Sequence, residues 1–167
     1  MVKLILVPCA PAMANLLVID DNESVRKTLE YCLSAAGHQV HLTPDGLSGL
    51  WYAAELPVDL ALIEANLPRM DGLAICRAMR ADPRTARIPL LLMTACATKK
   101  MAALGRIAGA NEVLEKPAFI QNLTATIYRN LPAPLNGGAS SPDGFGAPGS
   151  SAPPIGPVNA ASPSVRG

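Results

Sequence analysis

The sequence is poor in aromatic and charged residues. Aromatic side chains make up 4% of its 167 residues and charged side chains 16%, while half are hydrophobic. A core built from this chain must therefore be aliphatic, and the length suits one ordinary domain. The formal net charge of +1 predicts no long-range attraction to nucleic acid or to an anionic membrane.

Motifs of several other function classes are also missing. The four cysteines, Cys9, Cys32, Cys76 and Cys96, form no CxxC pair, which argues against zinc and redox sites and suits a reducing cytoplasm. There is no GxGxxG or Walker loop, so a nucleotide-binding enzyme has little support. No stretch of about 18 apolar residues is present, so we expect no membrane span.

The N-terminal residues 1–14 loosely resemble a signal peptide. Pro8 and Pro11 interrupt the short apolar run, so we expect an N-terminal extension and a cytoplasmic protein instead. The sequence leaves open whether Met1 or Met13 is the true start.

The composition changes again at residue 132. Residues 132–167 hold eight of the sixteen prolines and seven of the thirteen glycines, with Asp143 and Arg166 as the only charges. Such a segment cannot bury enough apolar surface to offset its ordering entropy, so we predict a disordered tail.

Between these ends, residues 15–131 alternate short apolar runs with helical patterns. The runs predict five strands, at 16–19, 39–43, 58–63, 89–93 and 112–114. Helical spacing predicts five helices, one between Asn22 and Gly37 and the others at 45–55, 73–80, 99–108 and 119–130. This alternation favours a doubly wound α/β fold, in which helices cover both faces of a five-stranded parallel sheet.

Polar side chains stand at the carboxyl ends of these strands, where sheets of this kind bind ligands. Asp20 and Asp21 follow the first strand, Glu64 the third, Thr94 the fourth and Lys116 the fifth. Adjacent carboxylates suit Mg²⁺, while a hydroxyl and an ammonium can hold phosphoryl oxygens. Each residue alone has an ordinary reading as a helix cap, a turn or a loop charge. Their joint placement favours a site for phosphoryl chemistry.

Four stretches in this order resemble the receiver domain of bacterial two-component response regulators: LLVIDDNESV, VDLALIEANLPRMDGL, IPLLLMTA and GANEVLEKPAF. The resemblance covers about residues 15–131 and implies the flavodoxin-like strand order 2-1-3-4-5. It also implies roles for individual residues: Asp20, Asp21 and the backbone carbonyl of Asn66 as Mg²⁺ ligands, Thr94 and Lys116 as the supporting hydroxyl and lysine, and a cis Lys116–Pro117 bond.

Two positions depart from the family's pattern. Glu64 stands where the family carries its phosphoacceptor aspartate, and its carboxylate reaches about 1.5 Å further. A misplacement of about 1 Å can slow such a reaction roughly a hundredfold. The longer carboxylate can instead pair with Lys116 and Thr94 and partly mimic an aspartyl phosphate. The second departure is Val113, where the family usually carries a Tyr or Phe that reports the state of the site.

A metal role for Glu64 follows from the same position. Glu64 can join Asp20, Asp21 and Asn66 around Mg²⁺, although pairing with Lys116 would make the metal less necessary.

These departures favour a stand-alone, atypical receiver that serves as a phosphorylation-independent interaction module in signal transduction and is not an enzyme. One alternative is a conventional receiver that takes a phosphoryl group from a histidine kinase and loses it by Mg²⁺-assisted hydrolysis. Another is a receiver cut from a larger regulator. The resemblance implies a partner, either a histidine kinase or a downstream effector, on residues 99–108, 112–114 and 119–130. A homodimer stays open as well.

Overall fold

The computed structural model describes residues 13–132. The predicted extension and tail therefore lie outside the described residues, apart from Met13, Ala14 and Pro132. The elements in chain order are β1 (Asn15–Ile19), α1 (Glu23–Ala35), β2 (Gln39–Thr43), α2 (Gly46–Glu55), β3 (Leu60–Glu64), α3 (Gly72–Ala81), β4 (Leu90–Thr94), α4 (Lys99–Ala108), β5 (Glu112–Glu115), a 3-10 helix η1 (Ala118–Asn122) and α5 (Leu123–Asn130).

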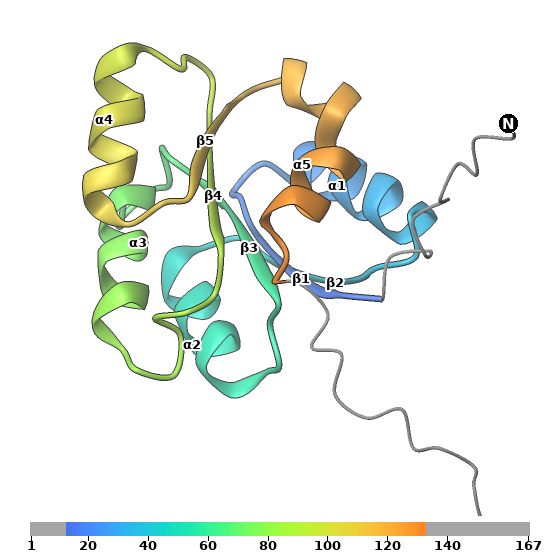
Figure 1. Ribbon diagram of the computed structural model, residues 1–167, viewed down its shortest axis with the longest axis horizontal. Coiled ribbons are helices and arrows are strands. Elements are labelled where there is room, and N and C mark those ends of the chain that lie inside the picture. Colours follow the sequence, from blue (N-terminus) through green and yellow to red (C-terminus); the bar gives the residue numbers. More distant parts are fainter. Residues whose placement is uncertain (1–12, 133–167) are drawn as a thin grey trace, which may run out of the picture. The chain divides into compact units, whose positions relative to one another are not determined.

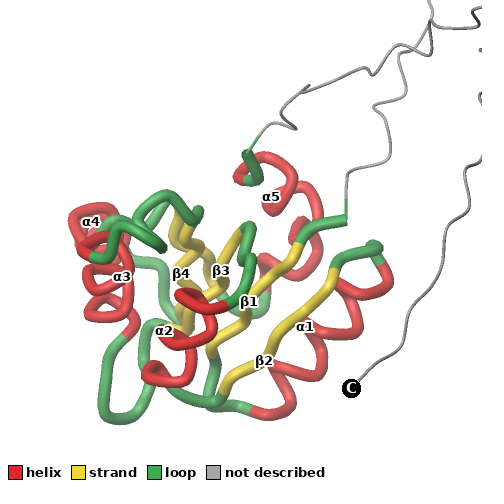
Figure 2. Tube along the Cα trace, turned by 90° about the horizontal axis from the view of Figure 1, so that it is seen from below, coloured by secondary structure: helices red, strands yellow, loops and turns green. Residues whose placement is uncertain are grey.

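The five strands in the described part of the chain form one parallel sheet in the order β2-β1-β3-β4-β5. Helices α2, α3 and α4 lie on one face of this sheet, and α1 and α5 lie on the other (Figure 1). Figure 2 shows the strands between these two helical layers. The predicted doubly wound fold and its strand order are confirmed.

The core consists of two aliphatic layers, because successive side chains of a strand point to opposite faces. In β1, Leu17 packs toward α2, α3 and α4, while Leu16 packs toward α1 and α5. The central strands β3 and β4 are buried along their whole length. Each therefore reads as a continuous apolar run that ends in a polar residue.

The helix signals in the sequence act as expected. The side chain of Asn22 accepts hydrogen bonds from the backbone N–H groups of Ser24 and Val25, at 3.0 and 3.2 Å. After the C-terminus of α1, Gly37 has φ of +89°, a left-handed conformation that favours glycine. Asp45 caps α2 in a similar way, through a bond from the backbone N–H of Ser48.

Some element boundaries differ from the predicted ones by one or two residues. The third strand begins at Leu60 rather than at Val58, because the backbone N–H of Val58 donates a local hydrogen bond to the carbonyl of Leu56. The predicted helix at 119–130 was wrong in one respect, since a 3-10 turn precedes a shorter α5. Glu64 is the last residue of β3 rather than the residue after it.

Candidate functional site

Three of the polar residues predicted at the strand ends meet at the carboxyl edge of the sheet. The ammonium of Lys116 forms ion pairs with Oδ2 of Asp20 and Oε2 of Glu64. Asp20 is fully buried, Glu64 is 7% exposed, and the side chain of Lys116 is 18% exposed. A partly buried cation is therefore shared between two buried carboxylates.

The sheet itself explains this convergence. Each of the three residues lies two positions after a strand residue that packs against the layer formed by α1 and α5. Side chains two apart along a strand share a face. The three strand residues are Val18, Leu62 and Leu114. The three polar side chains thus lie on one face of the sheet, just beyond its apolar residues. They come together because the parallel strands end side by side at this edge.

The remaining carboxylate oxygens also accept hydrogen bonds from the chain. Oδ1 of Asp20 accepts from the backbone N–H of Asn22 at 2.9 Å, and Oε1 of Glu64 accepts from that of Asn66 at 2.9 Å. Burial disfavours the charged ammonium of Lys116, but its hydrogen bonds to Asp20 and Glu64 outweigh this effect. The pKa of Lys116 is therefore raised above its ordinary value of 10.5.

Thr94 ends β4 beside this cluster but does not join it. The sheet register pairs Glu64 with Met93, so Thr94 lies one residue further along and belongs to the opposite face of the sheet. Its hydroxyl exchanges long hydrogen bonds with the backbone of Cys96, at 3.3 and 3.4 Å. Within residues 13–132 there is no bond from Thr94 to Glu64, although the sequence led us to expect one.

The predicted Mg²⁺ ligands come together only in part. Asp20 and Glu64 meet through Lys116, and the backbone of Asn66 contacts Glu64 through its N–H group, whereas Asp21 is exposed. Across the described chain, no group of three or more Asp, Glu, His or Cys side chains could hold a metal ion. Because an ammonium and two backbone N–H groups already engage the four oxygens of Asp20 and Glu64, these two carboxylates, as arranged here, do not fit the cation.

The sequence did not point to two further parts of the site. Nη1 of Arg26 donates to the backbone carbonyl of Asp20 at 2.7 Å. A basic residue early in the helix after the acidic pair is the only sequence signal for it. A pocket of about 190 Å³ adjoins Lys116 and is lined by Asn22, Ser24, Val25, Thr28, Lys116, Pro117 and Ile120. The Lys116–Pro117 peptide bond in its wall is cis, as the resemblance implies.

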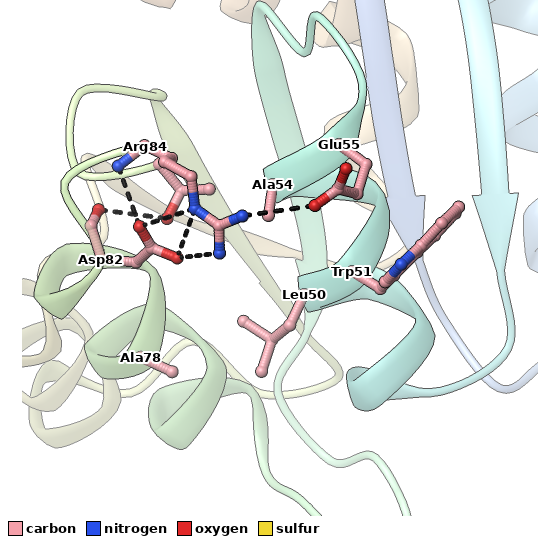
Figure 3. Close-up of a pocket in the computed structure, with 8 residues that line it drawn as sticks. Leu50, Trp51, Ala54, Glu55, Ala78, Asp82 and Arg84 are labelled. Atoms are coloured by element: carbon pink, nitrogen blue, oxygen red, sulfur yellow. Dashed lines mark hydrogen bonds and ion pairs between the residues drawn. The ribbon is translucent and has the colours of Figure 1, made fainter.

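A second pocket, of about 290 Å³, lies between α2 and α3 (Figure 3). Its lining includes no residue of the strand-end cluster. Leu50, Ala54 and Ala78 line its apolar part. At its rim, the guanidinium of Arg84 pairs with Asp82 at 2.7 Å and with Glu55 at 3.3 Å. The charged groups of this pocket are thus paired with one another. The strand-end cluster is the better candidate for the functional site.

Comparison with known proteins agrees with the fold. The model of the response regulator receiver domain matches residues 16–128. The chain belongs to this family. Among curated relatives of this receiver are the "DNA-binding dual master transcriptional regulator RpaA" of Synechocystis, 33% identical over 69% of this chain, and the response regulator MprA of Mycobacterium leprae, 34% identical over 68%. The matches cover 48% and 49% of those proteins, so the chain spans about half the length of the curated relatives it matches.

Solved structures give the same result for the receiver. The chemotaxis protein CheY4 of Vibrio cholerae is 30% identical with a TM-score of 0.68, and the match covers 72% of this chain and 100% of that one. The receiver domain of the sensor histidine kinase PA1611 from Pseudomonas aeruginosa is 28% identical with a TM-score of 0.66, over 71% of this chain and 98% of that one. That neighbour has a magnesium ion in its active site cleft. None of the helices described here is long and apolar enough to cross a membrane.

Proposed function

We propose that this receiver is an atypical signalling module that binds a protein partner without needing phosphorylation. The observation that carries the proposal is the ion pair between Glu64 and Lys116. In this arrangement, the glutamate carboxylate already engages the lysine that the family resemblance assigns to the phosphoryl group. Glu64 therefore acts as a built-in, partial substitute for an aspartyl phosphate.

The mimicry is partial in charge and in shape. A carboxylate supplies one negative charge and two oxygens, whereas a phosphoryl group supplies about −1.5 to −2 charges and three strong acceptor oxygens. Glu64 uses one oxygen for Lys116 and the other for the backbone N–H of Asn66. The hydroxyl of Thr94 bonds with the backbone of Cys96 instead, which supports an active-like arrangement at Lys116 only.

The surface we propose for the partner includes the exposed face of α4. Ile107 is 80% exposed and Leu104 is 38% exposed. Lys99, Lys100 and Arg106 lie on the same helix, which carries no acidic residue. Basic groups around exposed apolar side chains favour a partner segment that presents acidic residues beside apolar ones. A histidine kinase or a downstream effector could supply such a segment.

Phosphoryl transfer is tested directly by intact mass spectrometry after incubation with Mg²⁺ and a small phosphodonor. We expect no adduct of about 80 Da, the mass of one phosphoryl group, on the wild type. Glu64→Asp restores the family's phosphoacceptor aspartate and serves as the positive control for adduct formation. An adduct on the wild type that is lost in Glu64→Gln would establish the conventional receiver instead and overturn this proposal.

Partner binding is tested by a pull-down from an extract of the source cells, followed by quantification of the recovered protein. We expect recovery to be unaffected by phosphodonor and to be lost in Ile107→Glu. Tyr31→Glu is the matched control, because Tyr31 is 78% exposed on α1, on the other side of the sheet. Equal losses of recovery in both variants would contradict the proposed surface. Recovery that requires the phosphodonor would contradict the proposed independence from phosphorylation.

A further inference from the structure

The positive charge at the strand ends comes from Lys116, a side chain of the protein itself. Its side chain is 18% exposed, and it contacts two carboxylates whose side chains are 0% and 9% exposed. Buried carboxylates need a compensating positive charge, because an unpaired buried charge is strongly unfavourable. In this receiver, Lys116 provides that charge.

The same oxygens are the ones that a divalent cation would need. Mg²⁺ requires near-octahedral oxygen ligands at about 2.0–2.1 Å. Oδ2 of Asp20 and Oε2 of Glu64 face the ammonium, and the other oxygen of each faces a backbone N–H group. A metal ion at Asp20 and Glu64 would therefore have to displace Lys116 from both carboxylates, or stand beside a second positive charge.

The length of Glu64 maintains this arrangement. Its carboxylate spans from the backbone N–H of Asn66 to the ammonium of Lys116. An aspartate at the same position would hold its carboxylate about 1.5 Å further back, away from Lys116. A shorter acid would thus loosen the contact with the lysine and leave room for an ion between the two carboxylates.

We propose that Lys116 takes the place of the divalent cation, so that the wild-type site is closed to Mg²⁺ and needs no metal to hold its shape. This inference rests on the same Glu64–Lys116 pair as the proposed function, but it concerns the metal and makes no assumption about a partner. It also predicts that removal of the ammonium creates a metal site that the wild-type chain lacks.

The experiment is a titration with MgCl₂ followed by amide chemical shifts in ¹H–¹⁵N NMR spectra. Up to about 10 mM Mg²⁺, we expect no saturable shift at Asp20, Asp21 or Asn66 in the wild type. In Lys116→Met and in Glu64→Asp, we expect saturable shifts at these amides and at least about tenfold tighter binding than in the wild type. Lys100→Met removes an exposed lysine and should behave as the wild type does.

Thermal unfolding supplies the second measurement, because a ligand that binds only the folded state raises the midpoint. Mg²⁺ should raise the midpoint of Lys116→Met and leave that of the wild type unchanged. If Lys116→Met folds only in the presence of Mg²⁺, the proposal is supported. Saturable binding of Mg²⁺ to the wild type would overturn the proposal. The proposal would also be overturned if Mg²⁺ caused no saturable shift in Glu64→Asp and neither bound Lys116→Met nor allowed it to fold.

The two proposals fail in different ways. A wild-type site that binds Mg²⁺ but gains no phosphoryl adduct would overturn only the metal inference. A phosphoryl adduct on the wild type would overturn the proposed function, whatever the titration shows.

Discussion

A Cβ atom placed on Gly105 of α4 would lie 2.5 Å from Cγ2 of Val113 in β5. The missing side chain at Gly105 is thus what allows the branched side chain of Val113 to lie against the helix. Val113 is half-buried and packs against the layer beneath α2, α3 and α4. The family resemblance assigns Val113 to the position of the usual aromatic reporter, and this contact ties β5 to the proposed partner helix through a small and stiff side chain.

Gly105→Ala should lower the free energy of unfolding by about 1 kcal/mol. Overpacking against Val113 costs about 1–3 kcal/mol, and the gain in helix propensity recovers at most about 1 kcal/mol. Urea unfolding of Gly105→Ala, Val113→Ala and the double variant forms a complete cycle. We expect the double variant to be more stable than the sum of the two losses predicts. Stabilisation by Gly105→Ala alone would contradict the close contact.

Lys116 should make stability depend on pH at the alkaline end. Its folded-state pKa is raised above 10.5, so the folded chain holds this proton more tightly than the unfolded chain does. The contribution is fully present below about pH 10.5 and is lost as the pH rises through the folded pKa. Urea unfolding from about pH 9 to 12 should show this loss in the wild type and in Lys100→Met, but not in Lys116→Met. Equal slopes in all three proteins would rule out a special role of Lys116.

His38 should make stability depend on pH at the acidic end. The residue is 5% exposed, and among the described residues its Nε2 atom has no hydrogen-bond partner. Burial lowers the pKa of His38 below its ordinary value of 6.5, so below about pH 6.5 the unfolded chain binds the proton more readily. Stability should therefore fall as the pH drops from about 6.5 to the folded pKa, as measured by urea unfolding. His38→Leu should lose this part of the dependence, and an NMR titration of the ring should give a pKa below 6.5; a higher value would refute the prediction.

The sequence predicts the fold and the core of the cluster well, for a physical reason. Strands that are buried on both faces read as continuous apolar runs, and a polar residue at the end of such a run is visible without a structure. Parallel strands then place Asp20, Glu64 and Lys116 at one edge. The cluster is predictable because its members come from strand ends, which the apolar runs locate to within a residue or two.

Features that depend on register or on local backbone geometry were not predictable. Whether Thr94 meets Glu64 depends on a one-residue offset between β3 and β4, and a one-residue offset changes the face of the sheet. The apolar pattern of residues 118–130 continues through both η1 and α5, and neither glycine nor proline marks their junction. The bond from Arg26 to the carbonyl of Asp20 depends on the direction of a side chain, which the sequence pattern does not set.

Arg80 of α3 holds together two loops at the edge of the sheet opposite the cluster. Its guanidinium and Nε donate to the backbone carbonyls of Ala86, Ile88 and Gly109 and to the side-chain oxygen of Asn111, at 2.8–3.0 Å. Oδ1 of Asn111 also accepts from the backbone N–H of Leu90. Arg80 thus links the loop before β4 to the loop between α4 and β5.

Arg80→Lys should therefore be costly even though it keeps the positive charge. An ammonium cannot reproduce the planar fork of donors that reaches several carbonyls at once, and hydrogen bonds from a charged group contribute about 1.5–3 kcal/mol each. We expect urea unfolding to show a loss of about 2 kcal/mol, which is less than all the bonds together because the ammonium keeps some of them. Arg77→Lys on the exposed side of the same helix should change stability by less than about 0.5 kcal/mol. Equal effects of the two substitutions would show that the loops are held by packing and not by the guanidinium.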